Sequence, residues 1–176
     1  IGHTQELLEQ AKETFENLGV SGSDAYNLEE ILLCWNRLKV FKNGSTQIHP
    51  SLKYDGSKKN TIGKVGLNLW GGTNQPNMVV LPEFEKPVGE LSMTFQAKCN
   101  GAEGDELDII ALKSLDQPDD YQVVKSIPKV GDGFYEFEVH FTGYEGRYIG
   151  FYAEDGVNYF VDNIEVTETP KSLRPT

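Results

Sequence analysis

The sequence predicts an all-β fold, an antiparallel β-sandwich with a short N-terminal helical lead-in. First, 18 Gly, 8 Pro, 9 Phe, 8 Tyr and 2 Trp among 176 residues are typical of short strands joined by turns. Second, beyond Trp35 apolar residues recur at every other position, which is the period of a strand with one buried face. Third, turn signals separate these stretches at intervals of about 8–12 residues, without the strand–helix alternation of a parallel sheet.

Helix and strand patterns compete in the N-terminal region. Leu7, Ala11 and Phe15 recur at helical spacing, and Thr4 is placed to cap a helix. The end of the same stretch alternates as a strand would. We therefore expect a brief helix or a loose lead-in, followed by a first strand near residues 13–18.

Three later stretches show the strand alternation most clearly. Their inward sets are Val65, Leu67 and Leu69; Leu91, Met93, Phe95 and Ala97; and Tyr135, Phe137, Val139 and Phe141. Most of the intervening residues are polar, so each stretch has one apolar face and one polar face. The remaining pattern predicts further strands at residues 77–82, 106–114, 121–127, 147–153 and 159–167.

The net charge restricts the classes of partner. Sixteen Lys and Arg against 27 Asp and Glu leave a formal charge of −11. Nucleic acid and anionic membrane surfaces both require a basic patch, and the sequence shows none. No apolar run approaches the ~20 residues of a membrane helix, so we expect no membrane insertion. An acidic chain suits divalent cations and neutral partners such as sugars, or its charge serves only to keep a surface protein soluble.

The sequence offers little support for catalysis. Cys34 and Cys99 belong to no C-x-x-C pair, which leaves either a disulfide between them or two buried free thiols. Cys99 continues the inward face of the strand that begins at Leu91, so we expect it to be buried and inert. No nucleophile elbow, zinc-protease motif or dinucleotide fingerprint is present. We therefore expect a protein that is not an enzyme.

Several segments, taken in order, carry a family resemblance. They are Phe15-Glu16-Asn17, Cys34-Trp35-Asn36-Arg37, Asp55-Gly56-Ser57-Lys58, Leu67-Asn68-Leu69-Trp70-Gly71, Gly146-Arg147-Tyr148-Ile149-Gly150 and Phe160-Val161-Asp162-Asn163-Ile164. Over residues 13–168 the chain resembles the choice-of-anchor, cleaved-adhesin and MAM-like jelly-roll domains. These are galactose-binding-like β-sandwiches of secreted bacterial surface proteins. The link between Asn17 and Cys34 is longer here than is usual in that family.

The resemblance implies a domain organisation and a location. A jelly-roll domain is expected at residues 13–168, with a lead-in or linker at 1–12 and a linker or tail at 169–176. Such domains belong to larger multidomain proteins that are secreted or lie at the cell surface. Because the chain starts at Ile1 and not at Met, we also expect it to be a mature or trimmed form.

The resemblance also implies a structural Ca²⁺ ion that ties the first strand to the last. The matching positions are Glu16, Asp55, Lys58 and Asp162. Phe160 and Ile164 read as core-facing, which turns Asp162 inward by parity. An inward carboxylate needs a partner, because burying an unpaired charge is costly. A Ca²⁺ ion would satisfy it, as would a Lys or Arg side chain or a group of backbone N–H donors.

Aromatic residues with polar neighbours predict a sugar site, in which a ring stacks on the apolar face of a pyranose. Trp70 lies by parity on the face opposite Leu67 and Leu69, and a loop rich in amides follows it. The candidate ligand-binding residues are Trp70, Asn74, Gln75, Tyr121 and Tyr152. The alternative is ordinary strand packing, since aromatic residues are common strand formers.

Three functions are compatible with the sequence. The first is an extracellular carbohydrate-binding module, and the second is a protein–protein adhesion or spacer domain without a sugar ligand. The third is a small hydrolase, but the sequence contains no catalytic motif that supports it. The fold alone does not choose among them, because one sandwich architecture serves many functions.

Overall fold

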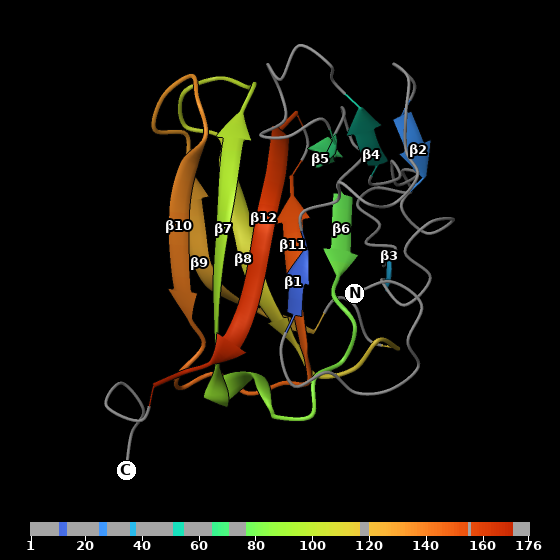
Figure 1. Ribbon diagram of the computed structural model, residues 1–176, viewed down its shortest axis with the longest axis vertical. Coiled ribbons are helices and arrows are strands. Elements are labelled where there is room, and N and C mark those ends of the chain that lie inside the picture. Colours follow the sequence, from blue (N-terminus) through green and yellow to red (C-terminus); the bar gives the residue numbers. More distant parts are fainter. Residues whose placement is uncertain are drawn as a thin grey trace.

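Two antiparallel sheets lie face to face in the computed structural model, with β7, β10 and β12 in front of β8, β9 and β11 (Figure 1). The structure describes residues 11–13, 25–27, 36–37, 51–54, 65–70, 77–116, 120–154 and 156–170. Side chains are described at residues 67–69, 78–116, 120–154 and 156–170. This arrangement confirms the predicted all-β sandwich.

The first sheet has seven strands in its described part, in the order β10-β7-β12-β5-β4-β2, with β1 added beside β12. Its strands are β1 (Ala11–Glu13), β2 (Ala25–Asn27), β4 (Ser51–Tyr54), β5 (Val65–Trp70), β7 (Leu91–Cys99), β10 (Tyr135–His140) and β12 (Asn158–Glu168). Strand β7 occupies one edge of β12 along most of its length, while β5 and β1 share the other edge. Ala11 pairs with Val166, so the start of the chain lies beside its last strand.

The second sheet has five strands in its described part, in the order β3-β6-β11-β8-β9. They are β3 (Asn36–Arg37), β6 (Asn77–Val80), β8 (Glu106–Leu112), β9 (Tyr121–Pro128) and β11 (Tyr148–Ala153). A single 3₁₀ turn, η1 (Val88–Glu90), precedes β7 in the described part of the chain. Strand β9 is paired only with β8 there, so it forms an edge of this sheet.

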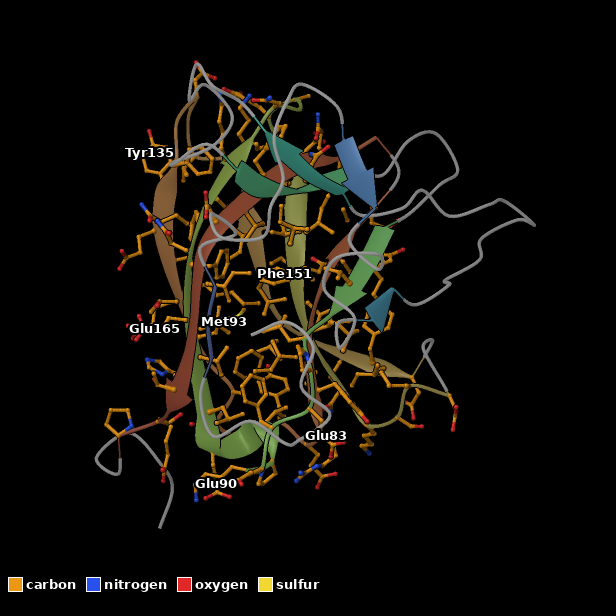
Figure 2. All side chains as sticks on the ribbon, turned by 45° about the vertical axis from the view of Figure 1, so that its right-hand side comes forward. Glu83, Glu90, Met93, Tyr135, Phe151 and Glu165 are labelled. Atoms are coloured by element: carbon orange, nitrogen blue, oxygen red, sulfur yellow. The ribbon has the colours of Figure 1, made fainter. Side chains whose placement is uncertain are left out.

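The core fills the space between the two sheets. Among the strands whose side chains are described, alternate residues point into it, as the period-two pattern predicts. Met93 and Phe151 lie between the layers in Figure 2. The rings of Phe95 and Phe151 meet edge to face with centroids 5.4 Å apart, so the two sheets are joined by an aromatic contact at the centre of the core.

A β-bulge interrupts the last strand. The register between β12 and β7 shifts between Asp162 and Glu165, and Asn163 takes a φ of 49°. That left-handed conformation is one that Asn adopts more readily than most residues. Because the bulge adds residues on one strand only, it reverses which face the following side chains occupy.

The bulge corrects one prediction from parity. Ile164 and Val166 face the core as predicted, but Phe160 does not belong to the core cluster. Phe160 pairs with Asn68, which lies between two core-facing leucines, so both point to the opposite face. Asp162 shares the parity of Phe160 and is buried on that outer face, not on the core side.

Two further predictions concern the N-terminus and the cysteines. Residues Ala11–Glu13 form a strand, and the rest of the predicted helical lead-in lies outside the described residues. Cys99 is a buried free thiol, so it does not form the disulfide with Cys34 that the sequence left open. Within the described ranges, no helix is both long enough and apolar enough to cross a membrane.

Candidate ligand-binding site

The outer face of the second sheet carries an apolar cluster separate from the core. Its fully buried members are Met78, Val80, Ile110, Leu112 and Tyr152. Leu115, Tyr121 and Tyr148 pack against this cluster and are only partly buried. The accessible part of this face is therefore its border, where the two tyrosines lie.

Tyr121 is the predicted sugar-contact residue that keeps an exposed surface in the described part of the chain. It is the first residue of β9 and lies opposite Leu112 of β8. Its ring centroid is 5.6 Å from that of Tyr152, with the ring planes tilted by 37°. Because Tyr152 is held in the packed cluster, Tyr121 rests on a fixed ring. Its own ring is thereby held in one orientation before any ligand arrives.

Tyr152 does not fit its predicted role as a direct sugar contact. Its side chain has no exposed surface, so in this position it offers no ring face to a ligand. Tyr152 lies on the outer face of the second sheet, within the cluster that is separate from the core. The sequence pattern did not reveal that this second face is also packed. Tyr152 instead supports Tyr121 from beneath.

Apolar and polar side chains follow Tyr121 along the outer face of β9. Val123 is exposed and pairs with Ile110. A register shift at the next residue keeps Ser126 on the same outer face, opposite Asp108. The Ser126 hydroxyl donates to Asp108 Oδ1 over 2.8 Å. An aromatic ring, an aliphatic side chain and a hydroxyl–carboxylate pair thus follow one another along an edge strand.

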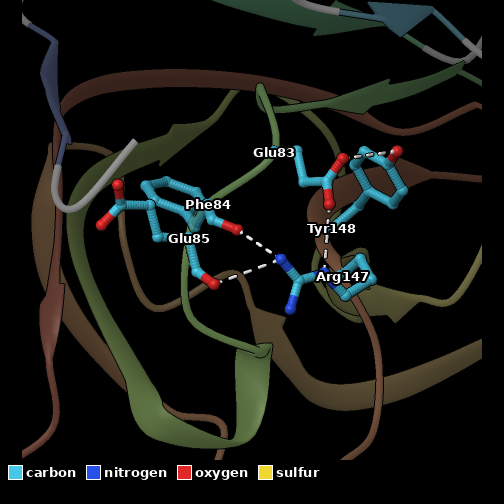
Figure 3. Close-up of polar contacts among 5 residues, drawn as sticks. All are labelled: Glu83, Phe84, Glu85, Arg147 and Tyr148. Atoms are coloured by element: carbon cyan, nitrogen blue, oxygen red, sulfur yellow. Dashed lines mark hydrogen bonds and ion pairs between the residues drawn. The ribbon is translucent and has the colours of Figure 1, made fainter. Parts of the chain in front are cut away.

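Arg147 holds the turn before β7 against the start of β11 (Figure 3). Its Nε donates to Glu83 Oε2 over 3.1 Å, and one terminal nitrogen donates to the carbonyls of Phe84 and Glu85 over 2.8 and 3.2 Å. The Tyr148 hydroxyl donates to Glu83 Oε1 over 3.2 Å. Each carboxylate oxygen of Glu83 therefore has a partner, and the hydrogen bond from Tyr148 fixes that ring beside the turn.

The environment of Tyr148 keeps its hydroxyl protonated. Burial raises the pKa of Tyr148, and the negative charge of Glu83 raises it further, while Arg147 opposes the shift. The phenol is therefore neutral at neutral pH and serves as a hydrogen-bond donor to Glu83.

Asp162 is the predicted calcium ligand that the structure describes. Asp162 is buried, with a relative exposure of 1%, and its Oδ1 accepts a hydrogen bond from the Asn163 backbone N–H over 2.8 Å. Asn163 Nδ2 donates to Gln96 Oε1 over 2.7 Å. Glu13 of β1 pairs with Ile164, which brings the start of the chain close to the bulge. The remaining predicted ligands, Glu16, Asp55 and Lys58, lie outside the described residues.

No group of three or more His, Cys, Asp and Glu side chains is placed to hold a metal within the described ranges. Asp162 is therefore the only predicted ligand whose surroundings are visible there.

The structure does not place Trp70 and Tyr121 on one sheet. Trp70 ends β5 in the first sheet, where its backbone pairs with Asn158, whereas Tyr121 belongs to the second sheet. The side chain of Trp70 and residues Asn74 and Gln75 lie outside what the structure describes. Their sugar contacts stay a prediction.

A hydrogen-bonded chain around His140 was not anticipated from the sequence. His140 Nε2 lies 2.6 Å from Glu138 Oε1, and Nδ1 lies 2.6 Å from Ser92 Oγ. Ser92 Oγ also lies 2.7 Å from Thr169 Oγ1. His140 thus links Glu138 to Ser92, and the Ser92 oxygen is shared between the imidazole and Thr169. Only cross-strand pairing of His140 with Ser92 creates this chain, so no sequence motif signals it.

The same three residue types make up nucleophile–base–acid chains in hydrolases. Here Ser92 has only 7% relative exposure, and its oxygen is shared with Thr169. We interpret the chain as a structural link that joins β7 and β10 to the residue following β12.

Above pH 10, we expect the protein to lose stability through Tyr159. Burial raises the pKa of Tyr159 above its ordinary value of 10.0, and the neighbouring Cys99 raises it further. The unfolded chain therefore ionises first as the pH increases, which favours unfolding by up to about 1.4 kcal/mol per pH unit. Chemical denaturation between pH 9 and 11 measures this slope. The slope should flatten in Tyr159→Phe but not in Tyr135→Phe, which alters an exposed ring.

Solved structures share this fold. A cleaved adhesin domain of Lys-gingipain matches with a TM-score of 0.63 at 17% identity, over 90% of this chain and 99% of that one. A variant of a family 29 carbohydrate-binding module matches with a TM-score of 0.55 at 13% identity, over 91% of each chain. The family 11 carbohydrate-binding module from Clostridium thermocellum, in complex with a β-1,3-1,4-mixed-linked tetrasaccharide, matches with a TM-score of 0.52 at 18% identity. That match covers 93% of this chain and 98% of the other.

No protein-family model and no curated protein matches the sequence. At these identities the structural similarity establishes the fold alone. The neighbours agree with the cleaved-adhesin part of the resemblance noted in the sequence.

Proposed function

We propose that this chain is an extracellular, non-enzymatic binding module that holds a neutral glycan along the outer margin of β9. The observation that carries the proposal is the partly exposed ring of Tyr121, supported from beneath by the buried ring of Tyr152. A ring fixed in this way costs little further entropy when a ligand stacks on it.

The groups beside Tyr121 have the chemistry that a sugar requires. A pyranose presents apolar C–H faces and a rim of hydroxyl groups. Tyr121 and Val123 offer apolar surface, and Ser126 of β9 with Asp108 of the neighbouring β8 offers a hydroxyl and a carboxylate on the same face. A carboxylate among the site's polar groups, together with the net charge of −11, disfavours anionic ligands and favours a neutral one.

The structural neighbours support the proposal that this chain is a binding module and that it is extracellular. Two of these neighbours are carbohydrate-binding modules, and another is an adhesin domain. A protein–protein adhesion domain is the alternative, and it predicts no glycan binding at all.

We expect Tyr121→Ala to weaken glycan binding by at least about 30-fold, the cost of losing a central aromatic contact. A glycan array with the wild-type protein selects the ligand, and isothermal titration measures the affinities. Tyr121→Phe is the matched variant, since it keeps the ring and should retain most of the affinity. If every neutral glycan on the array fails to bind the folded wild-type protein, the glycan proposal is wrong.

We also propose that a structural Ca²⁺ ion binds at the bulge of β12. The buried carboxylate of Asp162 supports this, together with the amide oxygens that neighbour it. Carboxylate and amide oxygens are the hard ligands that Ca²⁺ prefers. The ion would neutralise a buried charge and join the first strand to the last.

A further inference from the structure

We infer that the loop end around Tyr135 is a second sugar-contact point, so that a long neutral glycan is held at both ends of β9. This inference rests on the proposed function and adds a site to it. The juxtaposition behind it is an exposed aromatic ring, at the first residue of β10, lying against a loop that is fixed to the core.

The loop between β9 and β10 presents two large apolar side chains to solvent. Val130 is 59% exposed and Tyr135 is 45% exposed. Few large hydrophobic residues in the described part of the chain are exposed to this degree, and these two flank one short loop. In Figure 2, Tyr135 stands at one end of the molecule. The exposed ring of Tyr135 can therefore meet a ligand at this end of the molecule.

The ring of Tyr135 lies directly against Gly131. A methyl group added at Gly131 would meet the Tyr135 hydroxyl oxygen at 2.5 Å and its ring carbon Cζ at 3.2 Å. Gly131 is therefore required for the ring to lie where it does. Tyr135 is also fixed through its backbone, which pairs with Ala97 of β7.

Lys129 fixes the loop to the neighbouring turn. Its backbone N–H donates to the Asp105 carbonyl over 3.1 Å, and its ammonium donates to the Gly101 carbonyl over 2.7 Å. The buried hydroxyl of Tyr159 in turn donates to the carbonyls of Ile127 and Asp105 over 2.8 and 3.3 Å. The loop end is thus connected to the core, and binding there does not have to order it.

The chemistry of the loop end fits a single sugar residue. Lys129 and Asp132 form an ion pair at 3.6 Å, and the Asp132 carboxylate is 99% exposed, so polar groups of both signs lie beside the apolar ring. One ring and one valine are far smaller than the roughly 800 Å² that each partner contributes to a stable protein interface. A pyranose stacked on Tyr135 matches both the size and the mixed polarity.

The two contact points lie toward opposite ends of β9, although Tyr135 itself begins β10 in the first sheet. Tyr121 begins β9 and Pro128 ends it, so the strand spans about seven steps of 3.3 Å, roughly 23 Å, and the loop that Tyr135 contacts at Gly131 follows its far end. A polysaccharide can engage both points at once. Once it is bound at one point, its effective concentration at the other is high, which strengthens the overall binding. A short oligosaccharide can engage only one.

The test compares a polysaccharide with a disaccharide of the same repeat, both chosen from the array, in titrations of the wild type, Tyr121→Ala and three loop-end variants. Tyr135→Ala and Gly131→Ala should each lower the polysaccharide affinity by about tenfold or more, while Tyr135→Phe keeps it. In each of the three loop-end variants the disaccharide affinity at Tyr121 should stay at the wild-type value. Circular dichroism and the melting temperature confirm that these surface variants are folded.

Two results would overturn the inference and are distinguishable. If Tyr121→Ala loses binding while Tyr135→Ala binds the polysaccharide as the wild type does, the second contact point is wrong and the proposed function stands. If the wild-type protein binds no neutral glycan, the proposed function fails and the second contact point fails with it.

Discussion

Replacing Phe95 with alanine is expected to lower the free energy of unfolding by about 3–5 kcal/mol, the range measured for large aromatic residues in packed cores. Phe95 is fully buried in β7, which lies between β10 and β12 in the first sheet. Its ring contacts Phe151 of the opposite sheet at 5.4 Å and Phe137 at 5.7 Å. The truncation removes apolar burial and leaves a cavity at the contact between the two sheets.

Urea denaturation followed by tryptophan fluorescence or circular dichroism measures this loss. Val123→Ala serves as the control, because an exposed side chain should change stability by no more than about 0.5 kcal/mol. A loss below about 1.5 kcal/mol for Phe95→Ala would mean that the two sheets do not share the tightly packed core described above.

Removing Ca²⁺ is the second change for which we expect a large effect. An ion present at 100 times its dissociation constant stabilises the folded state by about 2.7 kcal/mol. For a chain of this size, its removal by a chelator should lower the melting temperature by about 5–10 °C. Differential scanning calorimetry with and without chelator measures the change, and re-addition of Ca²⁺ should restore it.

Asp162→Asn separates the proposed site from a general effect of the ion. The substitution keeps the shape of the buried side chain but removes its charge, so this variant should no longer respond to Ca²⁺. Asp132→Asn alters a fully solvated carboxylate and should respond as the wild type does. Equal melting temperatures of the wild-type protein with and without chelator would contradict the calcium proposal.

Strand positions in the second half of the chain were predictable because each strand there buries one face. Alternation of apolar and polar residues located the strands at Leu91–Cys99 and Tyr135–His140 almost to the residue. The bulge at Asp162 was not predictable in this way. A bulge changes parity without changing composition, so the pattern continued to read as a regular strand.

The candidate site was only partly accessible to sequence reasoning. Tyr121 and Tyr152 were both identified as candidate aromatic contacts, but the support of one ring by the other depends on packing across strands. The hydrogen bond between Ser92 and His140 joins residues 48 positions apart and likewise follows only from strand register. Tyr135 was assigned to the core face by alternation, whereas at the end of its strand the ring turns outward over Gly131.

The most direct test of the glycan proposal is a crystal structure of the protein with the oligosaccharide that the array selects. We predict a pyranose ring stacked on Tyr121 with carbon–carbon contacts of about 4 Å, and hydroxyl groups bonded to Ser126 or Asp108. A sugar bound elsewhere on the molecule, with the Tyr121 ring left free, would contradict the account.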